Sequence, residues 1–169
     1  MTRPKPTEAA DYYFKYINLV TSDDIVPAME SQMGEMLQLL SAISEEQSLH
    51  AYAPGKWTIR ELLNHVNDGE RIFAGRALWF ARGFTDPLPG FEQDIAVENA
   101  RANNTSWADL VEEFKYVRLS TISFFKSLPS EAWGRTGVAS DNPVSVNAIA
   151  YIIAGHVAHH IGVLREKYL

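Results

Sequence analysis

Apolar residues recur at intervals of three and four along four long stretches of the chain, which is the spacing of amphipathic helices. The four stretches cover residues 24–43, 58–81, 106–129 and 145–168. No pair of strands and no internal repeat is predicted between them. Because each apolar stripe has to be buried against another element, the pattern predicts an all-α fold built as a four-helix bundle.

Local signals mark where these helices begin. Thr58 and Glu61 have the spacing of a capping box, in which each side chain accepts a hydrogen bond from a backbone amide of the other residue. Ser106 and Ser145 are suited to cap the third and fourth helices, and Asp24 offers an acceptor at the start of the first.

The connection between the second and third helices is long and polar. Residues 86–105 contain two prolines and leave room for about one helical turn. Connections of this length are uncommon in compact domains, and this one indicates a bundle with one long crossover connection. We expect residues 1–6 to form a flexible N-terminal tail and residues 7–169 a single domain, with the aromatic segment 7–18 packed on its surface.

Composition narrows the range of functions. The chain has 169 residues, 46% of them hydrophobic and 21% charged. Its net charge of −6 and the lack of any Lys/Arg cluster denser than Arg3 and Lys5 argue against binding to nucleic acid or an anionic membrane. There is no cysteine, so a bound metal must use nitrogen or oxygen ligands. The N-terminus lacks an apolar signal segment, and no window of about 18 uninterrupted apolar residues occurs, so we expect a cytoplasmic protein.

The placement of the histidines is the most informative chemical feature. Of His50, His65, His156, His159 and His160, three lie in the fourth helix. At about 100° per residue, His156 and His160 fall near the centre of the apolar stripe and about 40° apart, while His159 falls at its edge. His50 precedes a turn and is expected to be solvated.

Two neutral imidazoles in an apolar seam need several hydrogen-bond partners, and a metal ion satisfies one nitrogen of each. His65 lies on the flank of the second helix's stripe and is the candidate third ligand. Val157 follows His156, so the zincin motif His-Glu-x-x-His is absent. The alternatives are hydrogen-bonded core histidines, or His159 as a ligand in place of one of the three.

Three segments resemble the DinB-like superfamily, which includes YfiT-type metal-dependent proteins. They are Pro54–His65, Asn67–Arg71 and Ala150–His160. The resemblance implies a four-helix bundle whose metal, usually zinc or nickel, is bound at the positions of His65, His156 and His160. It also implies a possible homodimer, and relatives that include thiol-dependent transferases and isomerases.

A three-nitrogen site leaves a coordination position open. The leading hypothesis is therefore a metal-dependent transferase that uses a small thiol cosubstrate, or a hydrolase, acting on an unknown small-molecule substrate. The alternative is a non-catalytic, stress-related or ligand-binding bundle with a mainly structural metal. An ordinary helical interaction domain is a third interpretation.

The supporting residues are less well defined. Three acidic residues of the second helix are expected to be solvated or paired rather than catalytic, and two asparagines beside His65 are candidates to orient it. Four aromatic residues are pocket or core candidates, and two arginines are candidates to bind an acidic substrate or to be paired. These residues are Glu61, Asp68 and Glu70; Asn64 and Asn67; Trp57, Trp79, Phe80 and Tyr151; and Arg71 and Arg76.

Overall fold

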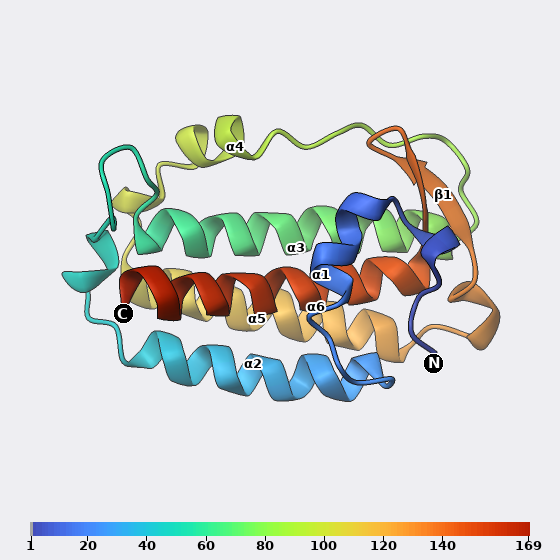
Figure 1. Cartoon of the computed structure of the whole chain (residues 1–169), viewed down its shortest axis with the longest axis horizontal. Coiled ribbons are helices and arrows are strands. Elements are labelled where there is room, and N and C mark those ends of the chain that lie inside the picture. Colours follow the sequence, from blue (N-terminus) through green and yellow to red (C-terminus); the bar gives the residue numbers. More distant parts are fainter. Residues whose placement is uncertain (1) are drawn as a thin grey trace.

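Four long helices lie side by side, with short segments wrapped around them (Figure 1). The structure is a computed structural model that describes residues 2–169. The long helices are α2 (Ile25–Ser41), α3 (Ile59–Ala81), α5 (Trp107–Lys126) and α6 (Val146–Val163). One turn of π-helix, Leu164–Tyr168, extends α6. All four predicted helices are confirmed.

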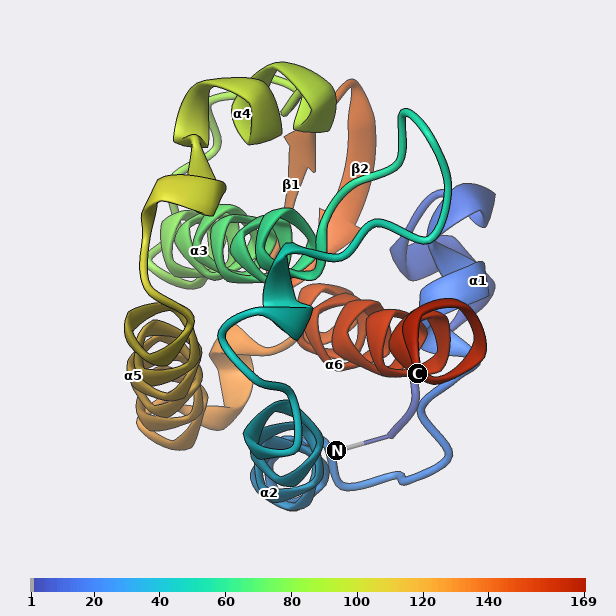
Figure 2. The ribbon, with the colours of Figure 1, turned by 90° about the vertical axis from the view of Figure 1, so that its left-hand side faces the viewer.

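The order of the helices around the bundle follows from the crossover. Viewed end-on, α3, α5, α2 and α6 follow one another around the core (Figure 2). The chain leaves α3 at one end of the bundle and runs back along its length before α5 begins, so α3 and α5 are parallel neighbours. The crossover contains α4 (Gln93–Ala100), which is longer than the single turn predicted. The four-helix bundle with one crossover is confirmed.

The helix starts follow most of the predicted signals. The Glu61 amide donates to the Thr58 hydroxyl at 3.1 Å, and the Thr58 amide donates to the Glu61 carboxylate at 2.7 Å. Ser106 and Ser145 each accept from an amide of the first turn of α5 and α6. The carboxylate of Asp24 makes no capping hydrogen bond. That part of the prediction is wrong.

The structure contains a short hairpin that the sequence pattern did not predict. Strands β1 (Thr136–Ala139) and β2 (Asn142–Ser145) are antiparallel, and the turn residues Ser140 and Asp141 are left-handed, with φ of 50° and 62°. Strands of four residues are too short to show a clear alternation, and the turn lacks the usual Asn-Gly or Asp-Gly pair. Backbone hydrogen bonds of 2.9 and 3.1 Å join Leu88 to β1 and to Ser140, and they attach the crossover to the hairpin.

The N-terminal segment packs against α6 through α1 (Phe14–Ile17). Gly155 permits this contact, because a Cβ there would lie 2.1 Å from the carbonyl oxygen of Tyr16. Within residues 2–6, the Arg3 guanidinium donates to the backbone carbonyls of Val20 and Ile17. The predicted aromatic segment is therefore held on the bundle at a defined place.

Helix α6 is buried on almost every side, because α1, α2 and α3 all pack on it. Val146–Tyr168 is long and apolar enough to span a membrane by composition, but 78% of its most apolar window is buried inside the bundle. That burial is typical of the central helix of a soluble bundle.

A polar layer divides the core into two apolar clusters. One cluster surrounds the first half of α6 and the second half of α3, and the other surrounds the opposite halves of the same two helices. Between them lie buried polar side chains from α3, α5 and α6, namely His65, Asn67, Glu70, Arg118, Thr121, His156 and His160. The fold thus places a polar site in the middle of an apolar interior.

Candidate metal centre

Three histidines from two helices converge in this polar layer. The Nε2 atom of His156 lies 3.0 Å from Nε2 of His65 and 3.1 Å from Nε2 of His160. One ligand atom from each residue lies within 4.8 Å of the others, and no side chain of the three is more than 8% exposed. The structure brings together the three histidines that the sequence singled out.

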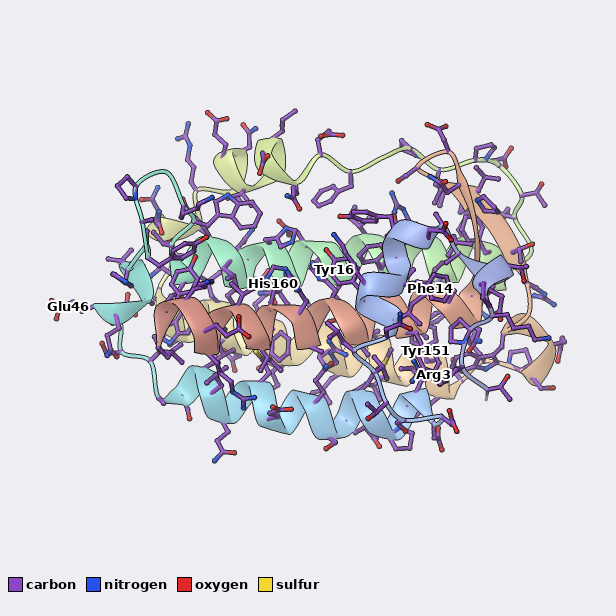
Figure 3. The ribbon with its side chains drawn as sticks, viewed as in Figure 1. Arg3, Phe14, Tyr16, Glu46, Tyr151 and His160 are labelled. Carbon is purple, nitrogen blue, oxygen red and sulfur yellow. The ribbon has the colours of Figure 1, made fainter. Side chains whose placement is uncertain are left out.

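Local packing orients the three rings. Gly69, one turn after His65 on α3, leaves space for the imidazole of His156, since a Cβ at this glycine would lie 3.1 Å from its Cε1 atom. The Trp57 ring lies 4.9 Å from that of His65, and the Tyr16 ring meets His156 edge-on at 5.5 Å. Tyr16 and His160 are labelled in Figure 3, which shows α1 crossing α6 close to the cluster.

Burial keeps the three imidazoles neutral. Desolvation lowers the pKa of His65 to about 4 and that of His156 to about 3, and it lowers the pKa of His160 well below its ordinary value. The carboxylate of Asp94 opposes this effect at His65, while neighbouring imidazoles add to it at His156 and His160. All three rings therefore offer a lone pair at neutral pH.

The contacts among these nitrogens fit a shared cation better than hydrogen bonds. Nε2 of a neutral imidazole carries either one hydrogen or one lone pair, so that of His156 cannot satisfy both of its neighbours. Nitrogens bound at about 2.1 Å to one tetrahedral or octahedral ion lie about 3.0–3.4 Å apart. The two separations of 3.0 and 3.1 Å fall within that range. The donor set and its spacing therefore suit a divalent transition metal.

Two of the remaining ring nitrogens of the cluster lack hydrogen-bond partners in the described part of the chain. Nδ1 of His65 and Nδ1 of His160 are buried, and neither has a hydrogen-bond partner among residues 2–169. His159 is exposed, and although its ring lies 5.0 Å from that of His160, it stays outside the three-histidine group. His50 is exposed, as predicted.

Two cavities reach the cluster. One, of about 140 Å³, is lined by Tyr12, Tyr13, Tyr16, His65, Gly69, Ile72, Phe73, Arg76, Phe91, Gln93, Ser140 and His156. The other, of about 350 Å³, is lined by Tyr52, Gly55, Lys56, Trp57, Leu62, Asp94, His159, His160, Val163 and Tyr168. Gln93 and Asp94 begin α4, and each of them lines one of the two cavities, so the start of the crossover helix contributes to both. Figure 2 shows α4 lying over α3.

The asparagines beside His65 have other roles. Asn64 donates to Asp68 at 2.9 Å, and Asn67 donates to the backbone of Leu110 and to Glu113, both at 3.3 Å. Neither contacts an imidazole nitrogen. The prediction that these amides orient His65 is wrong, because Asn64 bonds along α3 to Asp68 and Asn67 bonds across to α5.

The acidic residues of α3 are paired, as the sequence suggested. Glu61 belongs to the capping box, and Asp68 lies 3.5 Å from Arg71. Glu70 forms an ion pair of 2.8 Å with Arg118, and both side chains are at most 2% exposed. Burial raises the pKa of Glu70, while the guanidinium of Arg118 opposes that shift. None of these carboxylates lines either cavity beside the histidines.

The predicted aromatic residues divide between cavity and core. Trp57 lies against His65, whereas Trp79 stacks on Phe84 at 4.2 Å, and Phe80 and Tyr151 are core residues. The aromatic wall beside His156 was not predicted and comes from Tyr12, Tyr13, Tyr16, Phe73 and Phe91. The cluster of tyrosines before residue 18 was the only available signal, and it indicated packing without indicating where.

The fold and the site together define a helical bundle with a buried three-histidine group of the kind that binds a metal. Comparison with protein families then identifies the chain. It belongs to the DinB superfamily, whose family model matches residues 28–164. Comparison with curated protein sequences gives no significant match.

Several solved structures share this fold, among them YfiT and a thiol-dependent isomerase. YfiT from Bacillus subtilis, described as a probable metal-dependent hydrolase with an unusual four-helix bundle topology, superimposes with a TM-score of 0.74. The match has 14% identity and covers 96% of this chain and 89% of YfiT. A mycothiol-dependent maleylpyruvate isomerase gives a TM-score of 0.70 at 13% identity. That match covers 86% of this chain but only 61% of the isomerase.

Proposed function

We propose that this protein is a metal-dependent enzyme that holds one divalent transition metal, zinc or nickel, through Nε2 of His65, His156 and His160. The convergence of these three buried, neutral nitrogens carries the proposal. The chain has no cysteine, so the ligands are imidazole nitrogens, which suit both zinc and nickel.

A catalytic role is favoured because residues 2–169 supply a group of three ligands and two cavities reach it. A divalent metal bound in this way lowers the pKa of a coordinated water or thiol, or polarises a carbonyl group. The chain's own groups do the rest: Trp57 and Tyr16 shield the histidines from bulk water, and the residues lining each cavity hold a reactant.

The reaction we favour transfers a group to or from a small thiol cosubstrate. Two cavities on different sides of the cluster suit two reactants, and a thiol must come from solution because the chain has none. The isomerase with this fold is mycothiol-dependent. Hydrolysis is the second candidate, since YfiT is described as a probable hydrolase and water needs no cavity of its own.

Metal content and thermal stability of single variants test the site. His65→Ala, His156→Ala and His160→Ala should each lose stoichiometric metal, measured by mass spectrometry of the purified proteins, and should still unfold cooperatively. His159→Ala is the matched control, because its ring is adjacent but outside the group, and it should keep the metal. Full metal content in all three variants would exclude the site. Collapse of the fold in each would instead support a metal of mainly structural role.

A spectroscopic experiment tests the thiol. The cobalt-substituted protein should show a new near-ultraviolet sulfur-to-metal band when 2-mercaptoethanol is added, and a weaker effect with ethanol. An unchanged cobalt spectrum would contradict the thiol proposal and favour hydrolysis. The homodimer remains a prediction, and sedimentation of the metal-loaded protein measures it.

A further inference from the structure

Arg76 is a buried cation without an acidic partner. Three arginines among residues 2–169 are less than 9% exposed, namely Arg60, Arg76 and Arg118. Arg60 pairs with Glu45 and Arg118 with Glu70, whereas no carboxylate of the described chain lies within 4.0 Å of Arg76, which is 7% exposed. Burying an unpaired guanidinium is costly, so the fold retains a charge that it does not neutralise.

The contacts of Arg76 orient the group and leave much of it free. Its Nη2 atom donates to the carbonyl oxygen of Pro89 at 2.7 Å and to the hydroxyl of Ser140 at 3.0 Å. The Phe73 ring lies 5.7 Å from its Cζ atom. A guanidinium has five N–H groups, and these contacts use only Nη2. The crossover and the hairpin thus hold one edge of the guanidinium and leave its other donors available.

The guanidinium belongs to the same cavity as the metal candidates. Arg76, His65 and His156 all line the cavity of about 140 Å³. Arg76 follows Gly69 by seven residues, which places it two turns along the same face of α3, at about 10 Å. Helical side chains tilt toward the N-terminus, and the guanidinium lies 5.7 Å from the ring of Phe73, which is three residues nearer to the histidines along α3.

Many of the residues that line this cavity beside Arg76 and the histidines are apolar or aromatic. Ile72, Phe73 and Phe91 line the same cavity as the guanidinium and two of the three histidines. A neighbouring cavity of about 290 Å³ shares Ile72, Arg76 and Phe91 with the first and adds mainly apolar walls. A ligand with an anionic end and an apolar body fits this combination of groups.

We propose that Arg76 binds the carboxylate of a small organic acid, whose aromatic or apolar body lies against Phe73 and Phe91 and whose reacting end reaches the three-histidine site. This inference names the substrate class of the proposed enzyme and so rests on the proposed function. The carboxylate forms charge-assisted hydrogen bonds with the free N–H groups of Arg76, and Ser140 and Pro89 keep the guanidinium in position. Arg76 is thus a specificity-determining residue.

Calorimetric binding of 3-phenylpropionate tests the proposal, with the uncharged 3-phenylpropanamide as the matched ligand. Both are titrated into metal-free and zinc-loaded protein, since the metal-free protein isolates Arg76 from any carboxylate binding at the metal. We expect 3-phenylpropionate to bind both forms and the amide to bind at least about tenfold more weakly. Arg76→Gln should weaken carboxylate binding by about tenfold or more and leave zinc content unchanged.

Two further variants separate recognition from folding. Arg82→Gln removes an exposed positive charge at the end of α3 that lines neither cavity, and it should leave binding unchanged. Arg76→Lys keeps the charge and should retain partial carboxylate binding even if Arg76→Gln unfolds. Equal carboxylate and amide binding, or unchanged binding in a folded Arg76→Gln protein, would overturn the assignment. If the histidine variants lose zinc but still bind the carboxylate, the role of Arg76 is supported. If the wild type binds the carboxylate but holds no zinc, the proposed metal site is wrong and the role of Arg76 is still supported.

Discussion

The contact between Gly155 and α1 offers a sharp test of how the N-terminal segment is held. Alanine at this position would place its Cβ 2.1 Å from the carbonyl oxygen and 2.4 Å from the carbonyl carbon of Tyr16. Ordinary contact begins near 3.4 Å, so α1 would have to move by roughly 1.3 Å, the difference of 3.4 and 2.1. Gly162 lies on the same helix and has no atom within 4 Å of its hypothetical Cβ.

The two substitutions should therefore act in opposite directions. Alanine is favoured over glycine in a helix interior by up to about 1 kcal/mol, and Gly162→Ala should gain that amount. Overpacking costs about 1–3 kcal/mol, and the obstacle at Gly155 is backbone, which has no alternative rotamer, so the upper part of that range applies. Gly155→Ala should then be destabilised by about 1–2 kcal/mol after the helical gain. The two variants should differ by about 2–3 kcal/mol, which corresponds to roughly 4–12 °C in Tm.

Thermal unfolding followed by circular dichroism on the metal-free proteins measures the difference. The displacement of Tyr16 should also weaken binding of 3-phenylpropionate, because this tyrosine lines the cavity, while zinc content stays that of the wild type. Equal stabilisation of both variants would refute the contact, and unchanged ligand binding in a destabilised Gly155→Ala protein would refute the role of Tyr16 in the cavity.

Three further outcomes follow from individual contacts. Gly69→Ala should weaken zinc binding, because the new Cβ crowds the imidazole beside it at 3.1 Å, whereas Gly75→Ala, with open space around it, should not; equal zinc affinities in a competition assay would contradict this. Ser145→Ala removes the hydroxyl that caps α6 and should lower the free energy of unfolding in urea by about 1–2 kcal/mol. An unchanged free energy of unfolding would contradict this prediction. Burial raises the pKa of Tyr168 to about 12, and its hydroxyl donates to the Trp57 carbonyl at 2.6 Å. The folded pKa lies above the unfolded value near 10. The stabilisation that the neutral Tyr168 hydroxyl gives to the fold is therefore fully present below pH 10 and is lost as the pH rises through about 12. Tyr168→Phe should therefore remove one phenol of high pKa from the ultraviolet titration, and a titration curve with that phenol still present would contradict the assignment.

The long helices and the histidine cluster were predictable for the same reason. The periodic apolar positions in α3 and α6 record which side of each helix faces the centre of the bundle, and His156 and His160 fall on that side of α6. The parallel arrangement of α3 and α5 follows from the length of the connection between them. The helices and the positions of the histidines on them follow from nearby residues in the sequence, and the helix order follows from the length of a single connection.

The cavity walls were not predictable in this way. The hairpin has strands of four residues and a Ser-Asp turn, so neither alternation nor turn chemistry identified it. The environment of Arg76 depends on Pro89 and Ser140, which are far from it in sequence and which meet only through the pairing of Leu88 with β1. Burial of α6 on nearly all sides also weakened its stripe, since α1 covers a face that helical periodicity would assign to solvent.

The long helices and the shorter segments packed around them contribute different parts of the site, and this affects how the binding specificity of such a protein can change during evolution. The three histidines stand on α3 and α6, whose replacement would disturb the core, whereas much of the neighbouring cavity is built by the N-terminal segment, the crossover and the hairpin turn. Tyr12, Tyr13 and Tyr16 even precede residues 28–164, the part that matches the superfamily. Mutations in these segments leave the long helices intact, so under the proposed function natural selection could change the substrate without rebuilding the three-histidine group. A combinatorial library confined to residues 12–16, 91–93 and 140 is the corresponding route for directed evolution of new specificities on the same scaffold.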